Sequence, residues 1–300
     1  MTTLQTPTTP PPALIQLRAV HGSSADTAMI ESWAGGAGWS LGRGDLALFT
    51  RHHPDGLLIG MLDDRPVSAM MIACHHDEIC FISAPIVNPA HTGRRIQAAT
   101  AAMGLSYLAD RTVAVEAPPH MREFFAARGF YTRWRSITFA GPVPAPRTAD
   151  PHVLPVETDL LHQVADLDTS CFPTDRTAMA IDWAREPDRQ ALGYVKNDRL
   201  LGYGVIRPGF GAARIGPLYA TEPHVAAAIF DALAEQAGRR GARSIAVDIP
   251  EPNPAARALC ETRGLSHDTE TLRMLRPGVR AGERAPDLTL LYGLTSRELG

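Results

Sequence analysis

The stretch of sequence at residues 86–97 reads Ile86-Val87-Asn88-Pro89-Ala90-His91-Thr92-Gly93-Arg94-Arg95-Ile96-Gln97. An apolar run, residues 79–87, leads into it, and an alanine-rich segment, residues 98–108, follows it. This pattern predicts the end of a strand, a tight turn and the opening of a helix. Such a junction directs backbone N–H groups and the positive end of a helix dipole to one spot, which suits a phosphate group. Arg94 and Arg95 add positive charge there, while the alternative interpretation is an ordinary surface turn.

The composition of the chain restricts the class of protein. Its 300 residues allow one large domain or two domains of ordinary size. An apolar fraction of 45% is normal for a protein that buries a sizeable core. The formal net charge of -3 and the lack of basic clustering disfavour nucleic acid and an anionic membrane as the main partner. No apolar run approaches the ~20 residues that a membrane-spanning helix requires.

The four cysteines, Cys74, Cys80, Cys171 and Cys260, are scattered along the chain. They form no C-x-x-C pair and have no metal-ligand spacing, so we expect no metal site. Residues 1–12 are rich in Thr and Pro and lack the apolar core of a signal peptide, which predicts a disordered arm. We therefore expect a soluble, reduced, cytoplasmic protein.

The predicted elements of the first half recur in the same order in the second half. In the first half we predict strands at 13–20, 56–62, 66–74, 79–87, 112–116 and from 130, with helices at 25–33, 43–52, 94–108 and 120–127. In the second half we predict strands at 153–156, 191–195, 200–207, 213–218, 244–249 and 265–275, with helices at 159–167, 176–185, 223–239 and 254–263.

Two landmarks support an internal duplication. The Asp-Arg pairs at 64–65 and 198–199 lie 134 residues apart, and the glycines Gly129 and Gly264, each before an apolar residue, lie 135 apart. Chance placement of turns would rarely move both landmarks together, so we predict two copies of one α/β domain. The predicted parts are a disordered arm (1–12), a first domain (13–141), a proline-rich linker (142–151), a second domain (152–276) and a tail that packs back on the domains (277–300).

This order of elements, with the phosphate-suited turn after the fourth strand, resembles the GNAT superfamily of N-acetyltransferases. The resemblance implies two tandem GNAT-like domains, each a mixed, mostly antiparallel sheet flanked by helices. It also implies acetyl-CoA as the acyl donor, because in that family the backbone of this turn holds the pyrophosphate of acetyl-CoA. The candidate cofactor-binding residues in the first domain are then Ile86, Val87, Thr92, Gly93, Arg94, Arg95, Ile96 and Gln97.

The family signature at this turn, R/Q-x-x-G-x-G/A, is only partly present. Thr92 stands where Arg or Gln is usual, Arg95 replaces the central Gly, and Gln97 replaces the last small residue. Gly93 is kept. We expect the two arginines to contribute charge where the family uses backbone amides.

The second half resembles a GNAT-like C-terminal domain of tandem bacterial proteins. The residues that carry this resemblance are Cys171 to Arg176, Trp183, Gly202 to Arg207, Ile215 to Ala220, Asp248 to Asn253 and Tyr292 to Gly300. Asn253 is similar to the family Asn that contacts the pantetheine arm of the cofactor, although an N-cap before Pro254 would explain it equally. The turn after Leu218 has no Gly-rich loop, and Glu222 would repel a phosphate. We therefore expect the first domain to hold CoA and the second to shape the acceptor pocket.

Transfer of an acyl group to an amine requires a proton acceptor for the amine and is helped by an acid for the departing thiolate. The family position for that acid, often Tyr, is occupied here by Phe125 and Cys260, which leaves Tyr131 and Tyr219 as substitutes, and we take Tyr131 as the candidate. The candidate bases are Glu78 and Glu116. Glu78 lies in a His-His-Asp-Glu stretch that a solvated hairpin loop would also explain.

Two functions follow as alternatives. The first is an N-acyltransferase that moves an acetyl group from acetyl-CoA directly to the amine of a small molecule. The second is a catalytically degenerate tandem protein that binds a ligand or a partner, which the altered signature and the missing Tyr favour. The acceptor and the presence of a homodimer are left open by the sequence.

Overall fold

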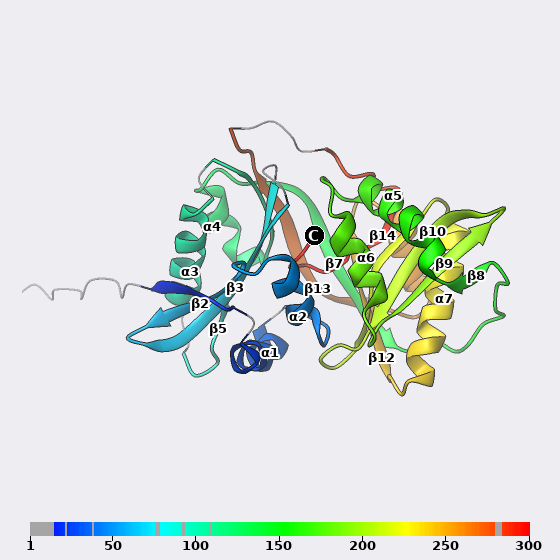
Figure 1. Cartoon of the computed structure of the whole chain (residues 1–300), viewed down its shortest axis with the longest axis horizontal. Helices are drawn as coiled ribbons and strands as arrows, with labels where there is room; N and C mark the ends of the chain where they lie inside the picture. The colour runs from blue at the N-terminus through cyan, green and yellow to red at the C-terminus, as the bar shows by residue number, and fades with distance from the viewer. Residues whose placement is uncertain are drawn as a thin grey trace, which may run out of the picture.

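The computed structural model describes residues 15–21, 23–37, 39–75, 79–91, 94–108, 110–279 and 284–300. The predicted arm at residues 1–12 lies outside the described residues. Figure 1 shows two lobes, one from each half of the chain, on either side of two long strands that run between them.

The first half contains the predicted elements with their ends shifted by a few residues. They are β1 (Gln16–Ala19), α1 (Ser24–Ala37), α2 (Asp45–His52), β2 (Leu57–Leu62), β3 (Arg65–His75), β4 (Ile79–Ser83), β5 (Ile86–Val87), α3 (Arg94–Ser106), β6 (Thr112–Ala117), η1 (Pro119–Met121), α4 (Arg122–Ala126) and β7 (Tyr131–Pro142). One prediction is wrong, because the strand expected at 79–87 is two strands. The strand is interrupted at Ala84 and Pro85: β4 pairs with residues 72–75 of β3, and β5 pairs with Ser68 and Ala69 of the same strand.

The second half repeats this plan. Its elements are β8 (Val153–Pro155), η2 (Thr158–Leu160), α5 (Leu161–Cys171), α6 (Thr177–Arg185), β9 (Gln190–Lys196), β10 (Arg199–Arg207), β11 (Ala213–Ala220), α7 (Pro223–Arg239), β12 (Ser244–Pro250), α8 (Pro254–Thr262), β13 (Ser266–Arg276) and β14 (Leu291–Gly293). The short strand β14 lies in the predicted tail and was not expected as a strand.

The two equivalent hairpins turn in the same way. Asp63 and Asp64 connect β2 to β3 with φ values of 48° and 59°, and Asn197 and Asp198 connect β9 to β10 with 52° and 57°. Two consecutive residues with positive φ make the type I′ turn whose twist matches that of the flanking strands, and Asn and Asp tolerate this conformation. The Asp-Arg landmark of the duplication therefore marks two copies of one hairpin turn.

The two halves exchange their last strands. In the described residues the sheet has the order β1-β2-β3-β4-β6-β13-β7-β12-β11-β10-β9-β8, so β13 lies between β6 and β7. The second half thus supplies the strand beside β6, and the first half supplies the strand beside β12. Figure 1 shows β7 and β13 as the central strands that join the lobes. One sheet consequently passes through both halves without a break.

The sheet is mixed and mostly antiparallel, which confirms the predicted fold class. Its parallel neighbours are β4 with β6 and β11 with β12, one pair in each half. In the second half, side chains alternate between two helical layers: Tyr203 and Val205 face the cluster that contains α5 and α6, while Ile206 faces the cluster of α7 and α8.

One hydrophobic core is shared by both halves. It includes Trp33, Phe49 and Phe81 from the first half together with Phe172 and Trp183 from the second. Two further clusters lie under α3 and α4 of the first half and under α7 and α8 of the second. Burial of so many large apolar side chains between the halves stabilises their relative position.

The expectation that every cysteine is reduced is wrong for one pair. The Sγ atoms of Cys74 and Cys80 form a disulfide, because these residues lie directly opposite each other on β3 and β4. Spacing along the sequence did not show this, since the pairing depends on the hairpin register. Cys171 and Cys260 are free and buried.

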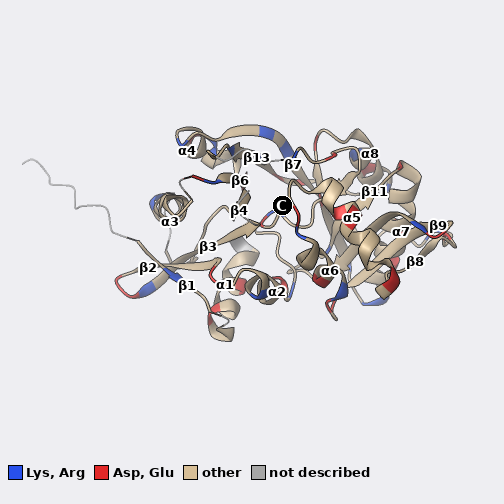
Figure 2. Ribbon diagram, turned by 45° about the horizontal axis from the view of Figure 1, so that its top comes forward, with Lys and Arg blue, Asp and Glu red and all other residues tan. Residues whose placement is uncertain are grey.

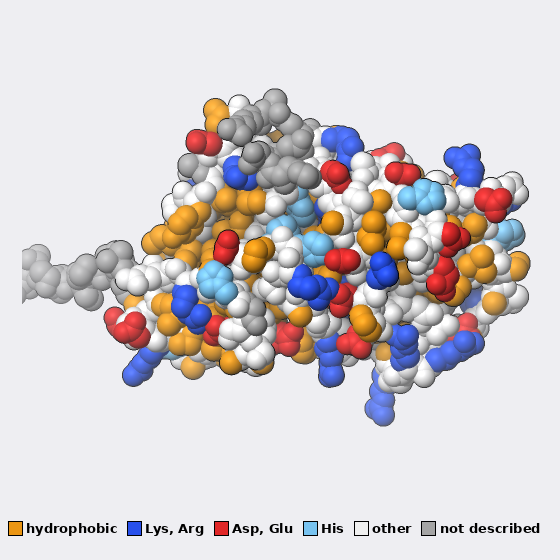
Figure 3. Space-filling model, viewed as in Figure 1, with side chains coloured by type: hydrophobic (Ala, Val, Ile, Leu, Met, Phe, Trp, Pro, Cys, Tyr) orange, Lys and Arg blue, Asp and Glu red, His pale blue; other side chains and the backbone are white. Residues whose placement is uncertain are grey.

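The surface is mixed in character. Figure 2 shows basic and acidic residues interspersed along the chain in both lobes, as the small net charge suggests. Figure 3 shows more exposed apolar surface on the lobe of the first half than on that of the second. None of the helices in the described residues has the length and apolar character needed to cross a membrane.

Candidate functional site

The predicted phosphate-suited turn lies between β5 and α3. Asn88 closes it, because its Oδ1 accepts a hydrogen bond from the Ala90 N–H at 3.0 Å and its Nδ2 donates to the Pro66 carbonyl at 3.2 Å. Helix α3 begins at Arg94, as predicted. Thr92, Gly93 and the side chain of Arg94 lie outside what the structure describes.

The remaining candidate cofactor-binding residues of this stretch have different surroundings. Ile86 is buried and Val87 half-buried in β5, whereas Arg95 is exposed in the first turn of α3 and Ile96 is half-buried there. Gln97, at the start of α3, contacts two other segments. Its Nε2 donates a hydrogen bond to the Pro85 carbonyl at 2.9 Å, and its Oε1 lies 3.1 Å from Nε2 of His120.

A cavity opens where β4 and β6 separate. The two strands are paired up to Ser83 and Glu116, after which the chain continues from β4 through β5, which pairs with β3, and β6 continues to η1. The cavity has a volume of about 270 Å³. Its lining residues are Trp39, Ser83, Ala84, Pro85, Gln97, Glu116, Pro118, His120, Thr269, Glu270, Thr271, Arg297 and Glu298. It therefore adjoins the predicted turn through Gln97 and receives residues from both halves of the chain.

Glu116, a predicted base, lies in this cavity but is held tightly. Its Oε1 accepts hydrogen bonds from Ser136 Oγ at 2.9 Å and Arg273 Nε at 2.6 Å, and its Oε2 accepts one from Thr271 Oγ1 at 2.6 Å. The ion pair with Arg273 is buried on both sides. These donors from β7 and β13 fix the position of the carboxylate and occupy both of its oxygens.

Glu298 is a second buried carboxylate in the cavity, and it was not among the residues predicted from the sequence. Its Oε1 accepts a hydrogen bond from the Ser40 N–H at 2.7 Å, and its Oε2 lies 3.2 Å from Ser40 Oγ. Burial and then the negative charge of Asp248 raise the pKa of Glu298, whereas the Ser40 N–H and Arg214 lower it by less. One sequence feature pointed to this part of the chain. The stretch from Tyr292 to Gly300 is similar to the C-terminal ends of tandem proteins, but this similarity assigns no role to Glu298.

The predicted acid Tyr131 lies away from the cavity. It is 45% exposed and lies on β7, five residues before Ser136, or about 16 Å along the strand. Its phenol oxygen accepts a hydrogen bond from Arg133 at 3.3 Å. Of the predicted catalytic residues that the structure describes, Glu116 therefore lines the cavity and Tyr131 does not. The predicted base Glu78 lies outside the described residues.

The corresponding opening in the second half is filled by the chain itself. Strands β11 and β12 are paired only from Ala213 to Ile215, and β14 then pairs with β11 in the gap. The Leu294 N–H donates to the Asp248 carbonyl at 2.8 Å, which connects the inserted chain to β12 as well. We call residues 288–300 the C-terminal segment; Figure 1 shows its end between the two lobes.

Asn253 contacts this segment. Its Oδ1 accepts the N–H groups of Ala255 and Ala256 at 3.1 Å, which makes it the N-cap of α8. Its Nδ2 lies within hydrogen-bonding distance of the carbonyls of Leu288 (3.1 Å), Thr289 (3.4 Å) and Leu291 (3.0 Å). The side chain proposed to hold a pantetheine arm thus serves as a cap and binds the protein's own backbone.

A buried arginine anchors the end of the segment. Arg176 forms a two-point ion pair with Asp168, with both N···O distances at 2.9 Å. It also donates to Thr295 Oγ1 at 2.6 Å and to the carbonyls of Leu299 and Gly300 at 3.3 Å. The two stretches singled out in the sequence, Cys171 to Arg176 and Tyr292 to Gly300, therefore contact each other.

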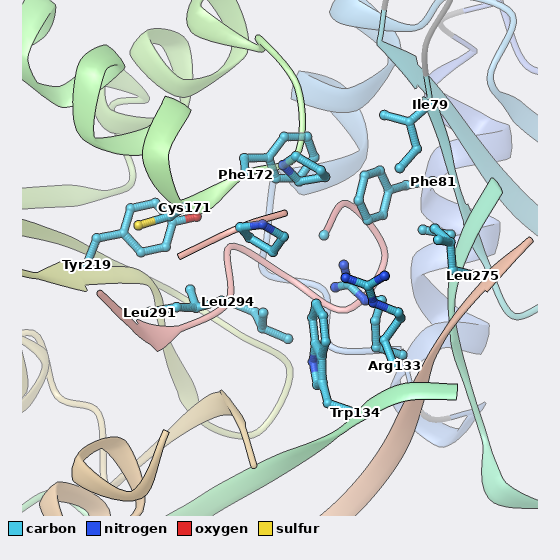
Figure 4. Close-up of a pocket in the computed structure, with 15 residues that line it drawn as sticks. Ile79, Phe81, Arg133, Trp134, Cys171, Phe172, Tyr219, Leu275, Leu291 and Leu294 are labelled. Carbon is cyan, nitrogen blue, oxygen red and sulfur yellow. The ribbon is translucent and has the colours of Figure 1, made fainter. Parts of the chain in front are cut away.

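Aromatic rings complete this anchor at the seam between the halves. Figure 4 shows Phe81 and Phe172 close together there, and their ring centroids lie 4.9 Å apart. The guanidinium of Arg176 lies 3.6 Å from the centroid of Phe172. A side chain on Gly300 would approach Phe81 to 2.6 Å and Phe172 to 2.7 Å, so only glycine fits at this place.

The two residues that stand where the family often has its acidic Tyr, Phe125 and Cys260, are part of the hydrophobic core. Phe125 is fully buried, and Cys260 is 1% exposed. Burial raises the pKa of the Cys260 thiol to about 12.

Asp248 is equivalent to Glu116 in the duplication and is paired with Arg214 at 2.5 Å and Arg297 at 3.1 Å. Burial by itself would raise the pKa of Asp248, but these two cations lower it by more. The described residues contain no cluster of three or more His, Cys, Asp or Glu side chains placed to hold a metal ion.

Known proteins resemble the chain in both sequence and structure. Residues 164–289 match the family model of an acetyltransferase (GNAT) domain. The holothin acyltransferase of Pseudoalteromonas sp. (strain SANK 73390) is 23% identical over 272 residues, which is 91% of this chain and 90% of that protein.

Solved structures share the complete architecture. A putative acetyltransferase from Pyrococcus horikoshii superposes with a TM-score of 0.75 at 23% identity, over 96% of each chain. A tandem GNAT protein from the clavulanic acid biosynthesis pathway superposes with a TM-score of 0.60 at 14% identity, over 87% of this chain and 97% of that one. These matches identify a GNAT acetyltransferase domain over residues 164–289, and the whole chain has the fold of tandem GNAT proteins.

Proposed function

We propose that the protein is a CoA-dependent N-acyltransferase that moves an acetyl group from acetyl-CoA directly to the amine of a small molecule. One observation carries the proposal. The opening between the central parallel strands is a cavity in the first domain, whereas the C-terminal segment fills it in the second. The chain therefore offers room for a donor thioester in the first domain.

The surroundings of the cavity suit the two ends of such a donor. The start of α3, with the exposed side chain of Arg95, lies on the side of Gln97 and offers positive charge to phosphate groups. The reactive end would then lie near Ser83 and Glu116, where the strands separate. Ala84 directly follows β4 and has a small side chain. Its carbonyl accepts a hydrogen bond from Trp39 Nε1 at 2.7 Å.

The charge of the lining favours a cationic acceptor. The lining contains three carboxylates, Glu116, Glu270 and Glu298. Its basic side chains are Arg297 and the exposed His120. Arg297 is itself paired with Asp248. An ammonium group is thereby attracted to the cavity. The similarity to a protein named holothin acyltransferase supports the same class of reaction, acyl transfer.

The reaction requires few steps. The ammonium loses a proton, and the nitrogen lone pair attacks the thioester carbonyl carbon. The C–N bond forms, the C–S bond breaks, and the departing sulfur takes the second nitrogen proton to give free CoA thiol. The products are the amide, the thiol and one proton released to solvent.

Binding of acetyl-CoA, measured by isothermal titration calorimetry, tests the donor part. We expect one site per chain with a dissociation constant in the tens of micromolar or tighter. Ala84→Phe should fill the cavity and weaken binding at least tenfold. The matched control is Ala212→Phe, which adds the same ring to a separate cavity lined by Arg43, Arg240 and Arg243, and should leave binding unchanged. Equal loss in both variants, or no binding by the wild type, would refute this site.

A second candidate function is binding without acyl transfer. The observation in its favour is that the family's acid positions are the core residues Phe125 and Cys260. Release of CoA thiol, followed with a thiol reagent against a panel of primary amines, separates the two functions. Measurable acetyl-CoA binding with no amine-dependent thiol release would favour the binding function.

A further inference from the structure

The proposed transfer requires a group that takes a proton from the acceptor's ammonium, and four titratable side chains line the cavity: Glu116, His120, Glu270 and Glu298. Three of them are engaged or solvated. Glu116 is fixed by Arg273 and two hydroxyl groups. Glu270 is 31% exposed and lies 3.5 Å from both Arg135 and His267. His120 is exposed and contacts Gln97.

Glu298 differs from these three. It is 2% exposed, its carboxylate accepts hydrogen bonds from Ser40, and it forms no ion pair with any described residue within 4 Å. The neighbouring Arg297 points its guanidinium at Asp248 instead. A carboxylate held by a neutral partner in a buried place can gain a proton more readily than one paired with a cation.

We propose that Glu298 is the general base of the reaction and takes the proton from the acceptor's ammonium group. The inference rests on the proposed function and deepens it. Its consequence is that the C-terminal segment has two tasks. Residues 291–294 fill the second domain's groove, and four residues later the same segment supplies the base to the first domain's cavity. The active site is then composite, because neither half of the chain contains all of it.

The charged groups around Glu298 agree with this role. Asp248 on β12 disfavours a second negative charge nearby, and Arg214 on β11 partly offsets it. Across the cavity lie Glu116 on β6, Glu270 on β13 and His120 on η1, with Arg297 next in sequence. Burial acts with Asp248 to raise the pKa of Glu298 toward the range in which a base works near neutral pH.

In the proposed step the Glu298 carboxylate accepts one N–H proton of the ammonium, and the neutral nitrogen then attacks the thioester carbon. The C–S bond breaks as the C–N bond forms, and the sulfur takes the second N–H proton. The protonated Glu298 returns its proton to solvent before the next cycle. The atoms, protons and electrons of this step balance without an oxidant, a reductant or a metal.

The test compares Glu298→Gln with the matched control Glu261→Gln, which changes an exposed carboxylate of α8 outside the cavity. The probes are acetyl-CoA with either ethylamine, a strongly basic amine that is charged near neutral pH, or hydroxylamine, which is largely uncharged there. We expect Glu298→Gln to lower kcat with ethylamine by roughly 10²- to 10⁴-fold. Transfer to hydroxylamine should change by a few-fold at most, and Glu261→Gln should leave the rates with both amines unchanged.

Three further readouts separate a base from a structural residue. Glu298→Gln should keep the affinity for acetyl-CoA and the thermal midpoint, because its amide oxygen can still accept from Ser40 N–H. It should also lose the acidic limb of the pH–rate profile with ethylamine. Glu298→Asp keeps a carboxylate and should recover part of the rate.

The possible failures are distinguishable. Wild-type rates with both amines in Glu298→Gln, or equal loss with ethylamine and hydroxylamine, would overturn the role of Glu298 while leaving the proposed function standing. A wild type that binds acetyl-CoA but transfers to neither amine would instead overturn the proposed function, and the inference with it.

Discussion

Asn253 Nδ2 donates a hydrogen bond to the Leu291 carbonyl at 3.0 Å, so the second domain binds the protein's own backbone beside β11. The equivalent opening of the first domain is a cavity of about 270 Å³. Two copies of one fold have therefore diverged by what occupies the gap between their parallel strands. One copy keeps the gap free, and the other closes it with a segment that extends to the first.

Asn253→Asp separates the two tasks of this side chain. The new carboxylate can still cap α8, but it places an oxygen where Nδ2 faced the carbonyls of Leu288, Thr289 and Leu291. We expect a loss of about 1–3 kcal/mol in the free energy of unfolding, measured with urea. The matched control is Asn88→Asp, where Nδ2 meets a single carbonyl on a half-buried turn. An equal loss in both variants would contradict the special role of Asn253.

A buried ion cluster holds the two halves together. Asp45 is fully buried and lies 2.9 Å from Arg189 and 3.1 Å from Arg207, which come from the second half. Asp45→Asn removes the charge that both guanidinium groups share, and we expect a destabilisation of roughly 3–5 kcal/mol in urea unfolding. Asp26→Asn, which breaks the partly exposed pair with Arg18, should cost under about 1 kcal/mol. Similar values for the two variants would contradict this account.

His53 predicts a pH dependence of stability. Burial, followed by repulsion from His52, lowers the pKa of His53 to about 4, and its Nε2 is buried without a hydrogen-bond partner. The folded state therefore disfavours the protonated ring. Stability from this residue is complete above pH 6.5 and is lost as the pH falls from 6.5 toward 4, by an amount on the order of 3 kcal/mol.

His53→Phe should remove the pH-dependent contribution of His53 to stability while keeping an aromatic ring beside Phe49. We expect its free energy of unfolding to change less than that of the wild type between pH 6.5 and pH 4. His162→Phe, at an exposed position, is the control and should keep the wild-type slope. Parallel curves for wild type and His53→Phe would show that another group causes the acid sensitivity.

The disulfide between Cys74 and Cys80 closes a short loop between β3 and β4. The chain-entropy estimate for a loop of this size is about 2 kcal/mol. We expect the double variant Cys74→Ser/Cys80→Ser to unfold at a lower urea concentration, by a free energy of that order. A reducing agent should destabilise the wild type by a similar amount and leave the double variant unchanged. An equal response of both proteins to the reductant would contradict the assignment.

Arg95 predicts a modest electrostatic effect on donor binding. It is exposed in the first turn of α3, where its charge adds to that of the helix dipole. Arg95→Ala should weaken acetyl-CoA binding two- to fivefold, with a smaller effect at high salt, as measured by calorimetry. Arg122→Ala, at the start of α4 and paired with Glu123, is the control and should leave affinity unchanged.

Local patterns in the sequence were sufficient for the elements and their order. The turn pairs Asp63-Asp64 and Asn197-Asp198 adopt positive φ because their short polar side chains tolerate it, whatever surrounds them. The helix start at Arg94 and the N-cap Asn253 also depend on neighbouring residues alone. The tandem fold could be predicted for this reason, including the turn that adjoins the cavity.

The repeated elements, their turns and the resemblance to GNAT proteins could therefore be predicted from neighbouring residues. Three features depend on the folded chain: β7 and β13 are exchanged, the C-terminal segment fills one groove, and Glu298 accepts a hydrogen bond from Ser40, 258 positions away in the chain. Strand pairing through backbone hydrogen bonds and burial of apolar surface are largely indifferent to which half of the chain supplies the partner. Contacts of this kind leave no period or spacing in the sequence, and so the composite site became visible only in the folded chain.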